Sequence, residues 1–337
     1  WNLLSSISNQ IHHEFMSIFY PVQLFADWLT YSVFGIAQET ILASAVNFFI
    51  FDTIKIFLLL AVIIFAVSII RSYLPPEKIR TILSSEKKYF GNVLASLLGI
   101  ITPFCTCSAI PLFIGFLEAG VPLGTTFSFL VASPMINEVA LVLLLGMFGW
   151  KIALLYIFSG LVISILSGII IGHLKVENLV AEFVYKSKFN GQLQLPEMNW
   201  KQRINYAKSY TIGIINKVWI YVVIGIGIGA WIHGYVPMEL LVQYAGNGTW
   251  YSVPLAVIVG IPLYSNAAGI IPLVSVLTEK GVQLGTVLAF MMAVTGLSLP
   301  EFMILKKVMK LKLILIFAGI VGFGIMLTGY LFNFILG

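Results

Sequence analysis

The sequence predicts an all-α polytopic membrane protein made of two inverted-topology repeats. Each repeat is expected to contain transmembrane helices and a re-entrant or broken helical hairpin. An N-terminal amphipathic or membrane helix precedes the first repeat. Three observations support this fold class: the composition, the length of the apolar runs, and a similarity between the two halves of the chain.

The composition is that of a membrane protein. Hydrophobic residues make up 59% of the 337 residues and charged residues only 10%, whereas soluble domains contain about a quarter charged residues. Mean hydropathy is +1.00, and several apolar runs reach the roughly 20 residues that a membrane-spanning helix needs. The net charge of +5 is not a nucleic-acid signal, because the basic residues lie in loops, where they report topology.

The N-terminal region is only moderately apolar. Residues 16–36 are long enough to span a membrane, but Pro21, Gln23 and Asp27 interrupt them, so a span is left open. No cleavable signal peptide is expected, because the N-terminus lacks a basic segment. The predicted organisation is an N-terminal helix (1–41), membrane repeat 1 (42–172), an amphipathic cytoplasmic linker (173–209) and membrane repeat 2 (210–337).

Repeat 1 contains two clear apolar spans, residues 42–70 and 151–172. Asp52 and Lys55 lie near the start of the first span and are three residues apart, so they can pair on one helix face. Both are expected to extend toward the membrane interface.

Two further apolar segments of repeat 1 are interrupted by polar residues and proline. Residues 89–117 contain the run TPFCTCSAIP at 102–111, and residues 123–148 contain the run ASPMINE at 132–138. A break in the helix at membrane depth is tolerated only where the freed backbone groups face protein or a water-filled cavity. The interruptions therefore predict a buried polar site.

The second half repeats the first at a nearly constant offset. At 161 residues, Pro111 falls on Pro272 and Gly124 on Gly285, and at 163 residues Glu138 falls on Glu301. Charged residues, prolines and glycines align along with the apolar ones, so shared hydrophobicity does not account for the match.

Basic residues indicate how the halves are oriented. Loop 71–88 holds five, linker 173–209 six and loop 306–312 four, whereas 234–250, the counterpart of the first loop, holds none. These three basic regions lie together on the cytoplasmic side only if the segment 89–117 and its counterpart enter the membrane and return. We favour such re-entrant hairpins; a broken full-length span is the alternative.

Inverted repeats whose broken helices meet near the midplane are typical of secondary transporters. Half-helix ends offer unpaired backbone groups and dipoles to a substrate. No Walker-type phosphate loop is present, so ATP is not expected to be the direct energy source, and we expect no cofactor.

The run TPFCTCSAIP, together with GVPLG at 120–124 and SPMIN at 133–137, resembles the YraQ- and ArsP-type predicted permeases, which include organoarsenical exporters. The resemblance extends over both halves, from about residue 45 to about 335. Some relatives export trivalent methylated or aromatic arsenicals, and others are linked to soft metal ions. The resemblance implies that Cys105 or Cys107 meets the arsenic.

Candidate substrate contacts come from both halves. Thiolates are soft ligands, so Cys105 and Cys107 are also the candidate metal ligands, although small apolar filler at a tight turn is the alternative role. An ionised residue at the centre of a membrane helix costs roughly 2.5–3.5 kcal/mol, which favours a functional role for Glu138, whereas Glu301 could be interfacial. The predicted set is Cys105, Thr106, Cys107, Ser108, Ser133, Asn137, Glu138, Ser265, Asn266, Thr295, Ser298 and Glu301.

The favoured function is efflux of a thiophilic solute, a trivalent organoarsenical or a soft metal, through a midplane site between the two hairpin tips. An anion or sulfur-compound permease is the alternative within the same class. A membrane thiol-redox protein that uses Cys105 and Cys107 is the alternative from another class, and it would need a thioredoxin-like partner. Otherwise the expected partners are the lipid bilayer and the substrate, without nucleic acid, and the oligomeric state is left open.

Overall fold

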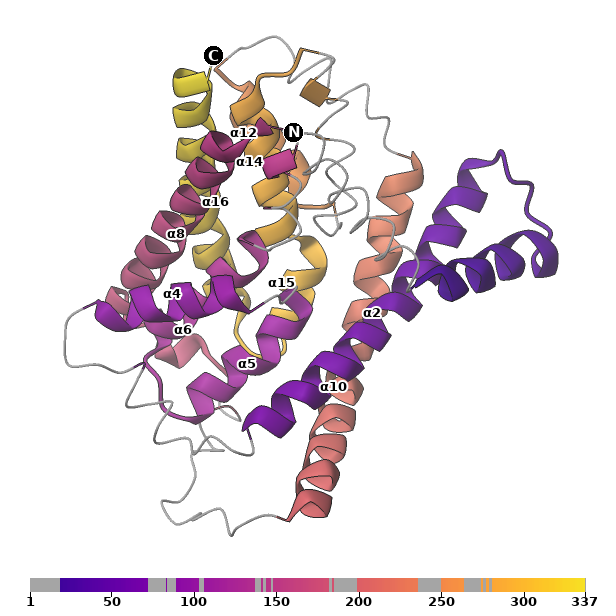
Figure 1. Ribbon diagram of the computed structural model, residues 1–337, viewed down its shortest axis with the longest axis horizontal. Helices are drawn as coiled ribbons and strands as arrows, with labels where there is room; N and C mark the ends of the chain where they lie inside the picture. Colours follow the sequence, from indigo (N-terminus) through magenta and orange to yellow (C-terminus); the bar gives the residue numbers. More distant parts are fainter. Residues whose placement is uncertain are drawn as a thin grey trace.

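The computed structural model describes residues 19–71, 83, 89–102, 106–136, 141, 144–146, 148–181, 184, 199–235, 250–263, 274, 277–278 and 281–336. Over these residues the chain is helical, apart from turns and one isolated bridge between Val180 and Met309 (Figure 1). The predicted all-α polytopic membrane fold is confirmed.

Four helical segments among the described residues are long and apolar enough to cross a membrane. The two clear spans predicted for repeat 1 correspond to α2 (Ile41–Arg71) and α8 (Trp150–His173). The chain is therefore a multi-pass membrane protein. The candidate spans are Ile41–Ala66, Trp150–His173, Leu284–Leu305 and Leu311–Leu336.

Helices α4 (Phe90–Ile101) and α6 (Leu123–Met135) run side by side in the same direction. A Cβ built on Gly91 would lie 3.2 Å from Thr125 Oγ1, and one built on Gly99 would lie 2.8 Å from Ala132 Cβ. The starts of the two helices are thus neighbours, and so are their ends.

Helix α5 (Thr106–Glu118) ends beside the start of α6, because a tight turn joins them in which the Val121 N–H donates to Phe116 O at 2.9 Å. The chain therefore enters with α4 and comes back with α5. Helices of 12 and 13 residues are about 20 Å long, which is too short for the roughly 30 Å of a bilayer core. These features agree with the re-entrant hairpin.

The sequence offset of 161 residues recurs in the packing of α12 (Ser252–Gly260), α14 (Leu284–Gly296) and α16 (Leu311–Leu336). Gly260 approaches Ala293 as Gly99 approaches Ala132. The backbone at Gly285 approaches the Gly329 carbonyl as that at Gly124 approaches the Gly168 carbonyl. Glycine is required where backbones come this close.

Equivalent positions of the two halves also touch each other. Met135 Cγ lies 3.8 Å from a Cβ built on Gly296, and Ile163 Cγ1 lies 3.2 Å from one built on Gly324; both pairs are 161 residues apart. A contact between a position and its own counterpart is the mark of a two-fold axis. The pairs α6–α14 and α8–α16 pack in this way, and the equivalent helices α2 and α10 (Trp200–Tyr235) also pack against each other.

Helices α8 and α16 run antiparallel. The stretch that follows α8 lies beside the stretch that precedes α16, since the Ala181 N–H donates to Val308 O at 2.7 Å and the Lys310 N–H donates to Leu179 O at 2.8 Å. The two helices lie side by side, and α16 rises to the C-terminus (Figure 1). Antiparallel equivalent spans agree with inverted repeats; the side of the membrane on which each end lies stays a prediction.

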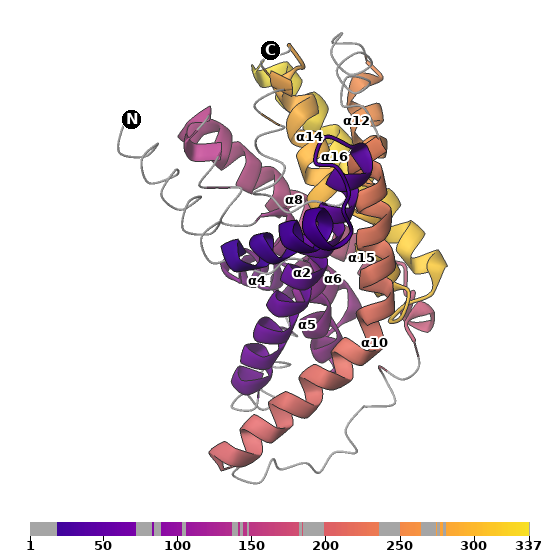
Figure 2. The same cartoon turned by 90° about the vertical axis from the view of Figure 1, so that its right-hand side faces the viewer.

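The N-terminal region forms an arm that leaves the bundle (Figures 1 and 2). Residues 19–27 are helical and continue into the π-helical turn η1 (Trp28–Val33), which packs on α2. Asn47 of α2 holds this helix, because its Nδ2 donates to Asp27 Oδ1 at 2.7 Å and its Oδ1 accepts from Gln23 Nε2 at 3.1 Å.

Asp52 and Lys55 form the predicted ion pair, with 3.6 Å between Lys55 Nζ and Asp52 Oδ1. Their extension toward the interface stays a prediction. Both lie near the middle of the candidate span Ile41–Ala66, with side chains 11% and 16% exposed. Lys55 Nζ lies 5.1 Å from the centre of the Phe51 ring. The Lys55 ammonium is therefore stabilised by the Asp52 carboxylate and the face of an aromatic ring.

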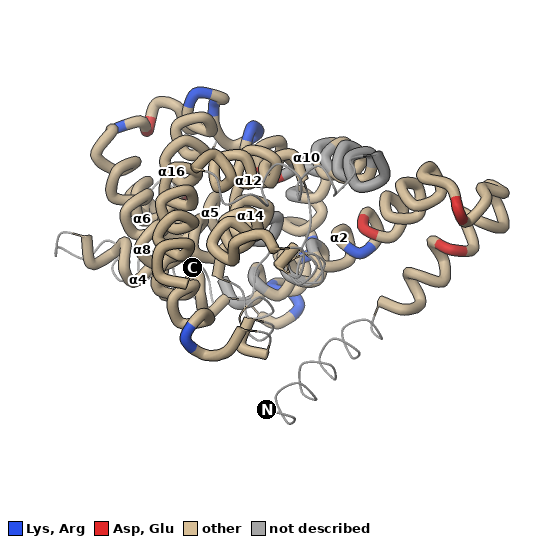
Figure 3. Tube along the Cα trace, turned by 90° about the horizontal axis from the view of Figure 1, so that it is seen from above, with Lys and Arg blue, Asp and Glu red and all other residues tan. Residues whose placement is uncertain are grey.

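Charged residues are few along the described trace, and most of the trace carries none (Figure 3). Helix α10 begins at Trp200, inside the segment 173–209 predicted as the linker. Its first turns carry the exposed Lys201.

Candidate functional site

Both halves contain a broken helix, at the places that proline and glycine predict. In repeat 1, α6 ends at Met135 with Pro134 in its last turn. In repeat 2, α14 ends at Gly296, and α15 (Leu299–Leu305) begins after two residues. Proline fits the first turn of a helix because its missing N–H would have no intrahelical acceptor there, and α15 has Pro300 at that place.

The ends of the two broken helices meet at Tyr156 of α8. The Tyr156 hydroxyl donates to Met135 O at 2.8 Å and lies near the Thr295 side chain, whose own hydroxyl donates to Met291 O at 2.9 Å. Carbonyls in the last turn of a helix lack an intrahelical donor, so Tyr156 supplies one to α6. We name Met135, Tyr156, Thr295 and Gly296 the helix-end junction.

Four predicted site residues are described with their side chains, and all are buried. Ser133 and Thr295 lie in the last turns of α6 and α14 and are 0% and 8% exposed. Ser298 stands at the N-cap position of α15 without a side-chain capping hydrogen bond, and Glu301, in the first turn, is 1% exposed. The structure therefore places Glu301 inside the protein, not at an exposed interface.

Helix α5 brings the cysteine motif to the same region. Thr106, Cys107 and Ser108 form its first turn, although their side chains lie outside the described part of the chain. Helix α5 packs against both α6 and α15, which carry Ser133 and Glu301. The predicted elements therefore converge, even though the contacts of the thiol are not described.

The other predicted contacts fall outside the described residues. These are Cys105, Asn137, Glu138, Ser265 and Asn266. Among the residues that the structure does describe, no group of three or more His, Cys, Asp or Glu side chains could hold a metal ion. A metal role for Cys105 and Cys107 stays a prediction.

Tyr156 is the junction residue that sequence reasoning missed. A signal for it exists: at the offset of 161 residues its counterpart is Phe317, so a hydroxyl is present in one half and absent from the other. Tyrosine hydroxyls that are buried usually have a hydrogen-bond partner, and the sequence did not reveal which backbone group that would be.

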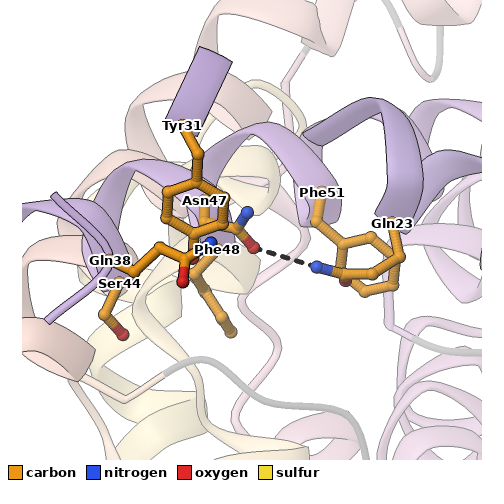
Figure 4. Close-up of a pocket in the computed structure, with 7 residues that line it drawn as sticks. All are labelled: Gln23, Tyr31, Gln38, Ser44, Asn47, Phe48 and Phe51. Carbon is orange, nitrogen blue, oxygen red and sulfur yellow. Dashed lines mark hydrogen bonds between the residues drawn. The ribbon is translucent and has the colours of Figure 1, made fainter. Parts of the chain in front are cut away.

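A second polar feature lies in the arm. A pocket of about 340 Å³ opens between the N-terminal helix and α2, and its floor contains the Asn47–Gln23 hydrogen bond (Figure 4). Polar side chains dominate the lining, which consists of Gln23, Tyr31, Gln38, Ser44, Asn47, Phe48 and Phe51.

Comparison with known families decides the class of protein. The family model described as "Predicted permease" (ArsP_1) matches residues 41–334. The chain belongs to this predicted permease family. The resemblance seen in the cysteine motif is thereby confirmed, and the match begins where α2 begins, so most of the arm precedes it.

Curated relatives of this permease come from bacteria and archaea. A Streptococcus mutans protein that is named as a subunit of a two-component membrane permease complex is 28% identical over 254 residues, which cover 74% of this chain and 79% of the relative. The UPF0718 protein MJ0584 of Methanocaldococcus jannaschii is 21% identical and covers 75% and 84%. YraQ of Escherichia coli is 22% identical and covers 67% and 63%. No solved structure matches this permease.

Proposed function

We propose that this permease is a secondary transporter of the cytoplasmic membrane that exports a small thiophilic solute, either a trivalent organoarsenical or a soft metal ion. The observation that carries the proposal is the helix-end junction, where broken helices of both halves meet in the protein interior. Secondary transporters with inverted repeats hold their substrate at such a meeting point.

The chemistry of the junction suits a thiophilic solute. Both α6 and α14 direct their C-terminal, partially negative ends to it, while α5 and α15 begin in the same region and bring partially positive N-terminal ends. Helix dipoles of both signs offset each other there, so the thiol is the feature that selects the solute. The first turn of α5, with Cys107, lies on a helix that contacts α6 and supplies the thiol that such a solute seeks.

Export follows from rocking of the two halves about the two-fold axis, which opens the site to one side of the membrane and then to the other. Loops 71–88, 173–209 and 306–312 are proposed to be cytoplasmic. Ser133, Thr295, Ser298 and Glu301 supply hydroxyl and carboxyl contacts from the buried ends of the broken helices.

Transport in inside-out membrane vesicles tests this function. Uptake of phenylarsine oxide is measured for the wild type, for Cys105→Ser, for Cys107→Ser and for the double variant at matched protein levels. We expect uptake by the wild type and its loss in the double variant. Undiminished uptake in the double variant would remove thiol coordination from the mechanism.

The alternatives predict other results in the same membranes. An anion or sulfur-compound permease would take up thiosulfate and would be indifferent to both cysteine substitutions. A thiol-redox protein would show a Cys105–Cys107 disulfide that exchanges electrons with a thioredoxin-like partner, which mass spectrometry of alkylated peptides detects.

We also propose that a second membrane subunit docks on the arm. The Streptococcus mutans relative is named as one subunit of a two-component complex, and here the arm exposes Trp28, Phe34 and Ile41 beside the polar pocket. Gln23, Asp27 and Asn47 bond to one another there, and a polar side chain of a neighbouring helix would extend this network and shield it from lipid. Native mass spectrometry of the complex extracted from its own membranes should find a heteromer; a monomer or a homodimer would contradict this proposal.

A further inference from the structure

Tyr156 is fully buried and joins the two halves of the permease. It stands on α8 in repeat 1 and donates to the carbonyl of Met135 at the end of α6. Thr295 at the end of α14 lies near it, and Met135 Cγ lies 3.8 Å from a Cβ built on the next residue, Gly296. One hydroxyl therefore lies at the ends of both broken helices.

The end of α6 rests closely on α8 around this tyrosine. A Cβ built on Gly160, one helical turn after Tyr156, would lie 2.7 Å from Ile136 Cγ1. A larger residue would push the chain away, so the glycine allows Ile136 to dock while Tyr156 holds the preceding carbonyl. Two successive turns of α8 thus fix where α6 stops.

The counterpart position in repeat 2 shows that packing at this place needs an aromatic ring but no hydroxyl. Phe317 occupies the place of Tyr156 in repeat 2, and its ring packs 5.6 Å from that of Phe127 and 6.3 Å from that of Phe302. A phenyl ring fills this position without a hydroxyl, so the hydroxyl of Tyr156 serves a purpose particular to repeat 1.

We propose that Tyr156 is a positioning residue for transport: its hydroxyl locks the end of α6 to the end of α14 and thereby sets Ser133 and Thr295 relative to each other in the substrate site. Ser133 lies two residues before Met135, and Thr295 directly precedes Gly296, which touches Met135. This inference rests on the proposed function, since it assigns Tyr156 a role in that same site.

Transport kinetics test the functional part. In proteoliposomes with phenylarsine oxide, Tyr156→Phe is expected to raise KM about fivefold and to change kcat less than twofold, as loss of one hydrogen bond of about 1 kcal/mol predicts. Thr295→Val should raise KM at least as much, because it also removes a proposed substrate contact. The double variant should show less than the product of the two effects, because both substitutions remove the linkage between Tyr156 and Thr295.

Tyr330→Phe is the matched control, since Tyr330 also donates its hydroxyl to a backbone carbonyl, that of Trp250, at the exposed end of α16. We expect no change in KM there. A KM that is unchanged in Tyr156→Phe while wild-type transport is intact would overturn the proposal. So would independent, multiplying effects of Tyr156→Phe and Thr295→Val.

Hydrogen–deuterium exchange without substrate separates this inference from the proposed function. The peptide of residues 130–136 should exchange faster in Tyr156→Phe than in the wild type and in Tyr330→Phe. Unchanged exchange overturns the positioning role. Faster exchange in a permease that moves no phenylarsine oxide supports the positioning role of Tyr156 and contradicts the proposed thiophilic substrate. If Tyr156→Phe does not fold, Thr295→Val is measured in its place, with the same two outcomes.

Discussion

Replacing Gly168 by alanine is expected to force α8 away from α4 and α6. A Cβ at this position would overlap Ser128 Oγ and the Gly124 carbonyl and would lie 2.8 Å from Asn92 Nδ2. Real Cβ atoms essentially never come closer than 3.0 Å to such neighbours. The helices must therefore separate, and the hydrogen bond from Asn92 Nδ2 to Ser128 Oγ at 2.9 Å is lost with them.

The size of the effect follows from these contacts. Overpacking costs about 1–3 kcal/mol and loss of the hydrogen bond about 1 kcal/mol, so Gly168→Ala should lower the free energy of unfolding by about 2–4 kcal/mol. At the equivalent Gly329, a Cβ would lie 2.7 Å from Val253 Cγ1 and 2.8 Å from Ala289 Cβ. Without the lost hydrogen bond, Gly329→Ala should cost about 1–3 kcal/mol.

Gly319→Ala is the internal control, because nothing lies within 4 Å of a Cβ built there. Alanine favours a helix over glycine by about 1 kcal/mol, so this variant should be at least as stable as the wild type. Unfolding is measured in mixed detergent–SDS micelles by circular dichroism. Equal stability of Gly168→Ala and Gly319→Ala would refute the close approach of α8 to α6.

Two further predictions concern buried charge. Asp52→Asn leaves Lys55 without its carboxylate in mid-span and should destabilise the permease by up to about 3 kcal/mol, whereas the double variant Asp52→Leu/Lys55→Met should recover the loss. The folded fraction in size-exclusion chromatography measures both effects. A stable Asp52→Asn variant would contradict the mid-span ion pair. Glu301→Gln keeps the shape of a side chain that is 1% exposed and should reduce transport about tenfold or more at normal protein levels, since a hydrogen bond to a charged group contributes about 1.5–3 kcal/mol. Glu118→Gln, at the half-buried end of α5, should leave transport unchanged, and equal rates for both variants would argue against a role for Glu301.

The sequence was sufficient for the helix breaks and for the packing of the repeat. Pro134 and Gly296 predicted where α6 and α14 end. The alignment of Gly124 with Gly285 anticipated two equivalent close approaches, because glycine marks places where backbones nearly touch. Such residues report local backbone geometry, and local geometry is what a single sequence records best.

The sequence did not predict where charged residues lie along a span or which groups buried side chains contact. Hydropathy put Asp52 and Lys55 near the start of the span 42–70, whereas the structure shows them as an ion pair near the middle of the candidate span Ile41–Ala66. The burial of Glu301 depends on the helices that surround α15, and the acceptor of Tyr156 is a backbone carbonyl 21 residues earlier in the chain. Tertiary contacts of this kind leave no periodic signal.

The two halves are most alike where they pack and least alike where chemistry is proposed. Both use glycine at the helix contacts, yet Cys105 and Cys107 have no thiol counterpart, and Tyr156 is matched by Phe317. Around a two-fold axis, identical side chains would present a solute with two equivalent orientations. Thiols and a hydroxyl confined to repeat 1 would remove that equivalence. Under the proposed function we therefore expect substrate preference to lie in repeat 1, and the shared packing to serve the movement of the two halves against each other.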